Sequence, residues 1–107
     1  MTTDNIEYLD KMSIENIVSN SEGIVFVECY KYSKGPLFII EPIMKKLHQS
    51  GMIQFKQYRV NLLEQPEIEV KYQIVVVPCY LVFNDHILID KIYGVTAFHE
   101  YINKIIE

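Results

Sequence analysis

The sequence predicts an α/β protein in which helices cover both faces of a central mixed sheet. Helix-like and strand-like segments alternate along the chain, as they do in α/β folds. Ile24–Tyr30 is apolar on both pleat faces, which is typical of a strand covered on both sides. Cys79–Phe83 and Ile87–Tyr93 flank a turn at Asn84-Asp85, which favours an antiparallel hairpin. A three-layer α/β/α sandwich, with parallel strands first and the hairpin later, satisfies these observations.

Two helices are expected in the first half of the chain because apolar residues recur there at helical spacing. One spans Ile6–Asn20, where turn residues end it. The other spans Gly35–Ser50, with Pro36 suited to its first turn and Gly51 to a left-handed stop. Pro42 lies inside this helix and is expected to kink it, because proline lacks the backbone donor and crowds the preceding turn.

The second half of the chain predicts further strands and two helices. A strand is expected at Ile53–Val60 and a short helix at Pro66–Tyr72. Ile74–Val77 is expected to lead into the hairpin, which Gly94 ends. Thr96 can cap a final helix with an apolar inner face. The residues of that face are Phe98, Tyr101, Ile102, Ile105 and Ile106.

Length, charge and cysteine content exclude several classes of protein. A chain of 107 residues predicts a single domain over residues 1–107. Ten basic and fourteen acidic residues give a formal net charge of −4, so nucleic acid and anionic membrane are poor partners. No signal peptide or membrane span is recognised, and we expect a cytoplasmic protein. Cys29 and Cys79 follow no metal-ligand spacing, and neither a metal nor another cofactor is expected.

Landmark residues at fixed separations resemble the thioredoxin family. Lys34-Gly35-Pro36-Leu37 occupies the place of that family's Cys-Gly-Pro-Cys motif, and Pro42 matches its helix-kinking proline. Val77-Pro78 matches the dipeptide with a cis peptide bond that faces the active site, and Gly94 matches the glycine after the last strand. The resemblance spans residues 14–106 and implies the thioredoxin fold.

The motif departs from the family pattern at the two positions where disulfide exchange takes place. Lys34 stands in place of the nucleophilic cysteine, and Leu37 stands in place of the resolving cysteine. Neither an ammonium group nor a hydrocarbon side chain can attack a disulfide or resolve a mixed disulfide. The resemblance therefore implies a thioredoxin-like protein that is redox-inactive at this motif, and no catalytic residue is assigned.

Glu28 corresponds to the family's buried acid beneath the redox site, and Arg59 falls where the family usually has the lysine paired with that acid. A carboxylate in an apolar strand needs a partner because its desolvation is expensive. Lys34 is the other candidate partner. The functional interpretation is a retained proton shuttle. Without motif cysteines there is no proton to transfer, so we expect a structural pair of Glu28 with Arg59 or a water-linked remnant of the family's pair.

The two cysteines carry the enzyme alternative. Cys79 follows Pro78 and Cys29 follows Glu28, on strands that the resemblance places side by side. As small apolar residues, both would belong to the core. The alternative is an atypical thiol oxidoreductase or redox sensor that acts through Cys79, with or without Cys29. The histidines are scattered and build no catalytic or metal site; they are His48, His86 and His99.

The resemblance also implies a shallow apolar groove around the former redox site. In the family, the backbone of the residue before the cis proline, here Val77, pairs with an extended peptide by β-augmentation. We expect an adaptor or chaperone-like module that is monomeric or weakly dimeric and binds a protein or peptide. The alternative is a scaffold without an open groove. The expected binding residues are Tyr30, Tyr32, Pro36, Val77, Pro78, Tyr93 and Gly94.

Overall fold

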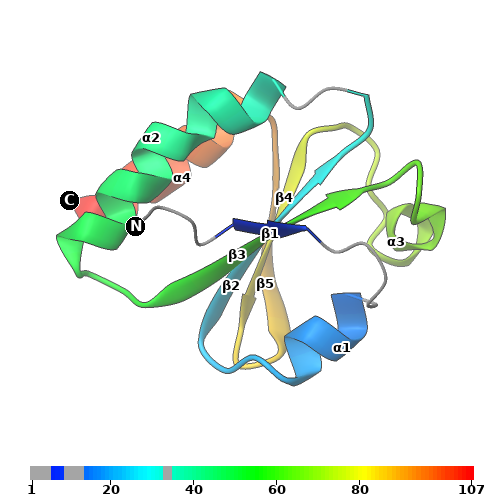
Figure 1. Ribbon diagram of the computed structural model, residues 1–107, viewed down its shortest axis with the longest axis horizontal. Coiled ribbons are helices and arrows are strands. Elements are labelled where there is room, and N and C mark those ends of the chain that lie inside the picture. Colours follow the sequence, from blue (N-terminus) through cyan, green and yellow to red (C-terminus); the bar gives the residue numbers. More distant parts are fainter. Residues whose placement is uncertain (1–5, 9–13, 33–34) are drawn as a thin grey trace.

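The computed structural model contains a five-stranded mixed sheet with helices on both of its faces (Figure 1). It describes residues 6–8, 14–32 and 35–107, and the side chains of residues 14–32 and 40–107. The strands are β1 (Ile6–Tyr8), β2 (Ile24–Tyr30), β3 (Phe55–Asn61), β4 (Cys79–Asn84) and β5 (Ile87–Tyr93). The helices are α1 (Ile14–Ser19), α2 (Gly35–Ser50), α3 (Pro66–Lys71) and α4 (Val95–Ile106). The predicted three-layer sandwich is confirmed.

The sheet has the order β1-β3-β2-β4-β5. β1, β3 and β2 run parallel, whereas β4 is antiparallel to both β2 and β5. This topology places the carboxyl end of β2 beside the amino end of β4, since Cys29 is opposite Cys79 in the register. The predicted order of parallel strands followed by an antiparallel hairpin is therefore confirmed.

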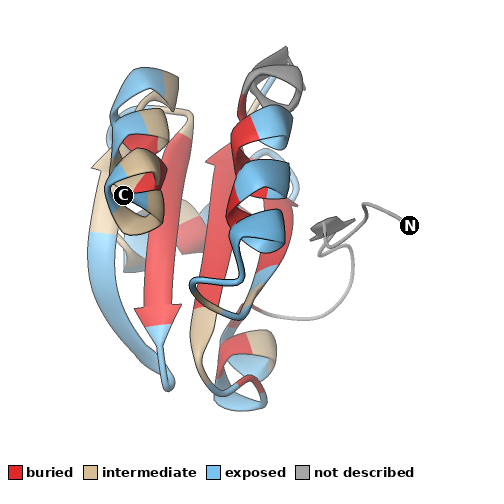
Figure 2. Cartoon of the chain, turned by 90° about the vertical axis from the view of Figure 1, so that its left-hand side faces the viewer, coloured by how far each residue is buried: buried red, intermediate tan, exposed pale blue. Residues whose placement is uncertain are grey.

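Two apolar cores pack on the two faces of the sheet. α2 and α4 cover one face, where their residues pack against Phe26, Tyr80 and Val82. α1 and α3 cover the other face with Ile14, Val18 and Ile68. β2 contributes to both cores because successive residues of a strand point to opposite faces. All of its residues from 25 to 30 are buried, which confirms the predicted central strand (Figure 2).

The first predicted helix is wrong in its amino-terminal part. Ile6–Tyr8 is a strand that pairs in parallel with β3, beginning with Ile6 opposite Gln57. The helix is confined to Ile14–Ser19. The physical reason is that β3 offers an open edge of backbone donors and acceptors, and pairing with that edge outweighs a weak helical spacing of apolar residues.

The approach to the hairpin also differs from the prediction. Residues 74–78 belong to no strand, and β4 begins only at Cys79. Ile74 is buried, whereas Val75 and Val76 are 78% and 52% exposed. Because proline has no backbone N–H, Pro78 cannot donate to a sheet ladder, and regular pairing starts after it.

Thr96 does not cap the last helix. α4 begins at Val95, and Gly94 is its N-cap residue. Gly94 has a φ of 94°, a conformation that glycine adopts without strain from a side chain. Of the predicted inner face, Phe98 and Ile102 are buried. Tyr101, Ile105 and Ile106 are partly buried and pack against the same core.

The other predicted helices and turns agree with the structure. α2 contains Pro42 and is followed by Gly51 with a φ of 69°, as expected for a left-handed stop. The predicted kink at Pro42 stays a prediction. β4 and β5 form the expected hairpin around Asp85 and His86, both of which have positive φ. No helix in the described part of the chain is long and apolar enough to cross a membrane.

β5 forms one edge of the sheet and is exposed along its first half. Ile87, Leu88 and Ile89 are 65%, 38% and 47% exposed. The pairing with β4 shifts in register between Val82 and Phe83, which leaves Ile89 without a direct partner on β4. Such a bulge bends the strand and increases its twist.

Candidate functional site

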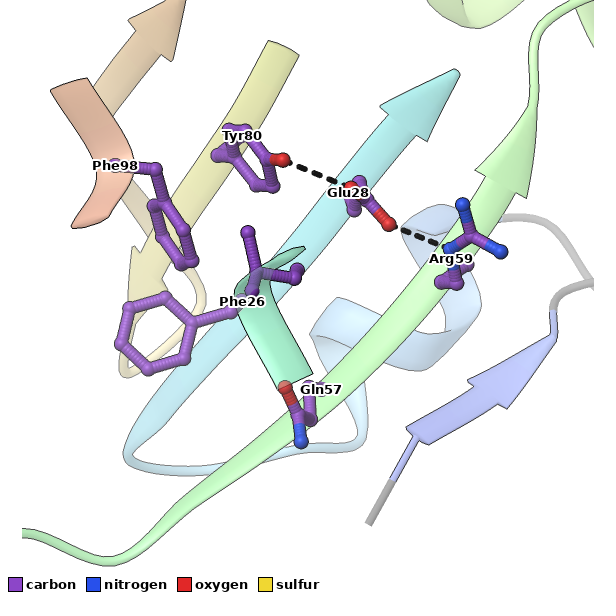
Figure 3. Close-up of a pocket in the computed structure, with 7 residues that line it drawn as sticks. Phe26, Glu28, Gln57, Arg59, Tyr80 and Phe98 are labelled. Carbon is purple, nitrogen blue, oxygen red and sulfur yellow. Dashed lines mark hydrogen bonds and ion pairs between the residues drawn. The ribbon is translucent and has the colours of Figure 1, made fainter. Parts of the chain in front are cut away.

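Three neighbouring strands bring a charged cluster together below the carboxyl end of β2. Glu28 on β2 is in register with Arg59 on β3 and with Tyr80 on β4. The Arg59 Nε donates a hydrogen bond of 2.5 Å to Glu28 Oε1, and the Tyr80 hydroxyl donates one of 2.8 Å to Glu28 Oε2 (Figure 3). Both carboxylate oxygens therefore have a donor.

The cluster is buried, so these hydrogen bonds must offset the cost of removing its charges from water. Glu28, Arg59 and Tyr80 are 3%, 2% and 1% exposed. Burial, and after it the charge of Glu28, raise the pKa of Tyr80 above its usual value, so its hydroxyl stays protonated and donates. Arg59 also packs over the ring of Tyr30, with its Cζ 4.2 Å from the ring centroid. The pair of Glu28 with Arg59 that the resemblance implies is present.

A small cavity lies beside this cluster, between the sheet and the layer of α2 and α4 (Figure 3). The volume open to the centre of a water molecule is about 10 Å³. One buried water needs roughly 10–15 Å³ by the same measure. The cavity can therefore hold a water near Glu28, but it is far too small for an organic substrate. Its lining residues are Phe26, Glu28, Ile40, Gln57, Arg59, Tyr80 and Phe98.

The two cysteines lie on the opposite face of the same strands. Cys29 and Cys79 are directly opposite in the register of β2 and β4, and both belong to the core under α1 and α3. Both are free thiols with 0% exposure. Burial raises the pKa of Cys79 to about 11, and it raises the pKa of Cys29 well above its ordinary value. Thiolate is therefore scarce at neutral pH, which disfavours a nucleophilic thiol.

The expected groove residues divide into exposed and packed ones. Tyr32 is 84% exposed, whereas Tyr30 is 8% exposed and belongs to the core. Val77, Pro78, Tyr93 and Gly94 are partly buried. The peptide bond between Val77 and Pro78 is cis, as the resemblance implies, and the Gly94 amide donates to the Pro78 carbonyl at 2.9 Å. The prediction that Tyr30 lies on the exposed groove is therefore wrong, because its ring is buried and packs on Arg59.

Part of the expected site lies outside the description. Lys34 is outside the described residues, so its candidate contact with Glu28 stays a prediction. Gly35, Pro36 and Leu37 begin α2 as backbone, and their side chains are outside the description as well. α2 therefore starts at Gly35, within the altered motif, as the spacing of the apolar residues predicts.

A second set of contacts, which the sequence did not reveal, holds the segment before Pro78. The Lys91 ammonium donates to the backbone carbonyls of Tyr72 and Gln73 at 2.9 and 3.2 Å. The Tyr93 hydroxyl donates to the Gln73 carbonyl at 3.2 Å. β5 thus fixes the turn at residues 72 and 73, which lies between α3 and the exposed Val75 and Val76. A lysine on an edge strand carries no sequence signal for this role.

The described side chains contain no group of three or more His, Cys, Asp or Glu residues that could hold a metal ion. His86 lies in the hairpin turn, where its Nδ1 is 2.7 Å from the Val18 carbonyl. His99 contacts Asn103 within α4 at 3.2 Å. His48 contacts the ring of Phe55 edge-on. The histidines are thus separate from one another and from the charged cluster.

The chain has sequence relatives among thioredoxins, although no family model matches it. It is 28% identical over 87 residues to the thioredoxin of Bacillus subtilis (strain 168), covering 78% of this chain and 84% of that protein. It is 24% identical to "Thioredoxin Y2, chloroplastic" of Arabidopsis thaliana over 87% of this chain. The chain spans 56% of that plant protein and 54% of the related "Thioredoxin Y1, chloroplastic".

Solved structures give the same picture for the fold. Oxidised thioredoxin from Plasmodium falciparum superposes with a TM-score of 0.73 at 20% identity, covering 95% of this chain and 99% of that one. Mitochondrial thioredoxin 3 from Saccharomyces cerevisiae gives a TM-score of 0.70 at 22% identity, covering 92% and 94%. The sheet order, the cis proline and these solved structures show that the chain has the thioredoxin fold, and its sequence is similar to those of thioredoxins.

Proposed function

We propose that this chain is a protein-binding or peptide-binding module, an adaptor or chaperone-like factor, that is redox-inactive at the thioredoxin motif. The absence of chemistry is inferred from Lys34 and Leu37, which replace both sulfur atoms of that motif. Disulfide exchange at such a motif needs an attacking thiol and a resolving thiol, and this motif has neither. Binding needs only the surface around the motif.

The observation that carries the proposal is an apolar surface at one end of the strands, where β2 ends and β4 begins. Val75 and Val76 are exposed immediately before Val77 and the cis proline. Tyr32 is exposed just after β2, at the same end of the strands, because the carboxyl end of β2 adjoins the amino end of β4. Exposed apolar side chains beside a backbone segment outside any strand suit an extended apolar peptide.

The contacts of this surface favour a prepared binding site over a collapsed one. Lys91 and Tyr93 hold the turn before the exposed valines. The Lys31 ammonium, in the segment just after β2, is 2.8 Å from Glu69 Oε2 on α3. The two loops that frame the surface are therefore tied to α3 and β5. A framed surface loses less conformational entropy when a peptide binds.

The rival function, a thiol oxidoreductase or redox sensor acting through Cys79, has weaker support. A catalytic thiol must reach its substrate and supply thiolate. Cys79 is buried, and its pKa is raised to about 11. A burial of this kind is typical of a cysteine that belongs to the core.

Insulin-disulfide reduction with dithiothreitol as electron donor tests the redox part. We expect the chain to give the rate of dithiothreitol alone. The matched variant is Lys34→Cys/Leu37→Cys, which restores the Cys-Gly-Pro-Cys sequence and should accelerate the reaction. Acceleration by the wild-type chain that disappears in Cys79→Ala would replace our proposal with the thiol rival.

Selection of extended peptides from a display library tests the binding part. We expect selected peptides to bind the wild-type chain, and Val76→Asp to weaken that binding about ten-fold or more. The matched control is Ile87→Asp, an equally drastic change at an exposed residue of the opposite end of the sheet. Equal weakening by the two variants, or no peptide selected, would contradict the proposal.

A further inference from the structure

The two cysteines of the chain face each other across a strand pair. Cys29 on β2 is directly opposite Cys79 on β4, and the two strands are antiparallel. Directly opposite residues in such a pair have Cα atoms about 4.5 or 5.5 Å apart, depending on the hydrogen-bond pattern. Disulfides join Cα atoms roughly 4.4–6.8 Å apart. The backbone therefore holds the two residues at a separation that a disulfide can bridge.

The side chains also lie on the same face, in one buried cluster. Directly opposite residues project to the same side of a sheet, and both cysteines pack in the core beneath α1 and α3. Burial, and after it the nearness of Cys79, raise the pKa of the Cys29 thiol. The two sulfur atoms are therefore close enough to influence each other. Neither thiol takes part in the proposed peptide binding.

We propose that Cys29 and Cys79 are a disulfide-forming site that closes under oxidation and ties β2 to β4. The oxidant is a small-molecule disulfide. One protein thiolate attacks it, forms a mixed disulfide and releases one small thiol. The second protein thiolate then attacks the protein sulfur of the mixed disulfide and releases the second small thiol. Two electrons and two protons pass from the cysteines to the small disulfide, and one protein disulfide replaces it.

Burial determines the kinetics of this site. A buried thiol with a raised pKa reacts only when the start of β4 opens, so closure in the folded protein is slow. Slow disulfide formation distinguishes this site from the fast-reacting thiols of a catalytic oxidoreductase. Once closed, it fixes Cys79, the residue that follows Pro78, against β2. The closed disulfide therefore ties β2 to the residue that follows the exposed Val75, Val76 and the cis proline.

The test compares disulfide closure in the folded and the unfolded chain. The full-length protein is equilibrated with mixtures of reduced and oxidised glutathione, in buffer and in denaturing urea, then alkylated and weighed intact. A native register that suits a disulfide makes the equilibrium constant for closure larger in the folded chain, by about 30-fold or more. The closed product has lost two hydrogens, takes up no alkylating reagent, and yields one cross-linked peptide containing both cysteines.

The wild-type comparison is sufficient even if cysteine variants fold poorly. An equilibrium constant that is equal in the two solvents, or smaller in the folded chain, would overturn the proposal. Mixed disulfides with glutathione, or disulfide-linked dimers, as the main oxidised species of the folded chain would overturn it as well. Cys29→Ala and Cys79→Ala serve as controls, since each must remove the closed product completely. A closed product that survives either substitution would also contradict the assignment.

Discussion

The two faces of the sheet bury ionisable side chains in different ways near the end of β2. Glu28 and Tyr80 point toward α2 and α4 and form a polar cluster with Arg59. Their chain neighbours Cys29 and Cys79 point toward α1 and α3 and lie among apolar side chains. On one face the cost of burial is offset by hydrogen bonds, and on the other it is avoided by keeping the thiols neutral. Burial alone therefore does not make a residue reactive.

The largest expected effect comes from breaking the charged cluster. Arg59→Met leaves the Glu28 carboxylate buried without its cation and should lower the free energy of unfolding by about 3–5 kcal/mol, measured by urea denaturation. The double variant Glu28→Met/Arg59→Met removes both charges and should be less destabilised than Arg59→Met. A double variant that is the less stable of the two would show that the pair is not the structural unit inferred from its geometry.

The thiol face should become destabilising at alkaline pH. Because the pKa of Cys79 is raised in the folded state, from 9.0 to about 11, the unfolded chain releases the proton first as the pH rises. The contribution of Cys79 to stability is complete below about pH 9 and is lost up to about pH 11, by about 2–3 kcal/mol. Between these pH values the free energy of unfolding of the wild type should therefore fall relative to that of Cys79→Ala, measured by urea denaturation. Parallel curves would contradict the shift.

The hydroxyl of Tyr80 is a smaller part of the charged cluster. Tyr80→Phe leaves Glu28 Oε2 without its donor and should cost about 1.5–3 kcal/mol in urea denaturation. Tyr101→Phe is the matched control, because the Tyr101 hydroxyl donates to the exposed Asp90 carboxylate at 3.0 Å. That variant should change stability by less than about 1 kcal/mol. Similar losses in both variants would remove the distinction between the buried and the exposed bond.

The smallest and most local effect is expected at the end of α3. Lys91→Met removes two hydrogen bonds to the carbonyls of Tyr72 and Gln73. This loss should lower the free energy of unfolding by about 1 kcal/mol. Amide exchange at Ile74, whose N–H donates to the Glu69 carbonyl, should become faster. Lys104→Met, at an exposed lysine of α4, should leave this exchange unchanged. Unchanged exchange in Lys91→Met would mean that other contacts hold the turn.

Much of the fold was predictable because its central elements have strong patterns. The apolar run of β2 and the strand–turn–strand pattern of the hairpin around Asp85 and His86 are recognisable in the sequence. β1 does not, because a three-residue edge strand is too short to have a period. The start of α4 depends on the conformation of Gly94, which only the folded chain reveals.

The site was predictable only as far as the resemblance carried it. Glu28 and Arg59 could be paired because the resemblance aligns them. Tyr80 was missed because a tyrosine in an apolar strand looks like any core residue, and its role follows from the register of β2 with β4. Tyr30 was expected in the groove, but its ring packs over Arg59 in the core. Side-chain partners of this kind are set by tertiary packing.

The register shift in β5 has a consequence for how the protein behaves at high concentration. An open edge that begins with three apolar residues is a template on which a second sheet could grow, chain by chain, toward a fibre. The extra residue Ile89 bends that edge out of line, so a flat strand from a neighbouring molecule meets mismatched donors and acceptors. An irregular edge of this kind therefore disfavours edge-to-edge pairing between molecules.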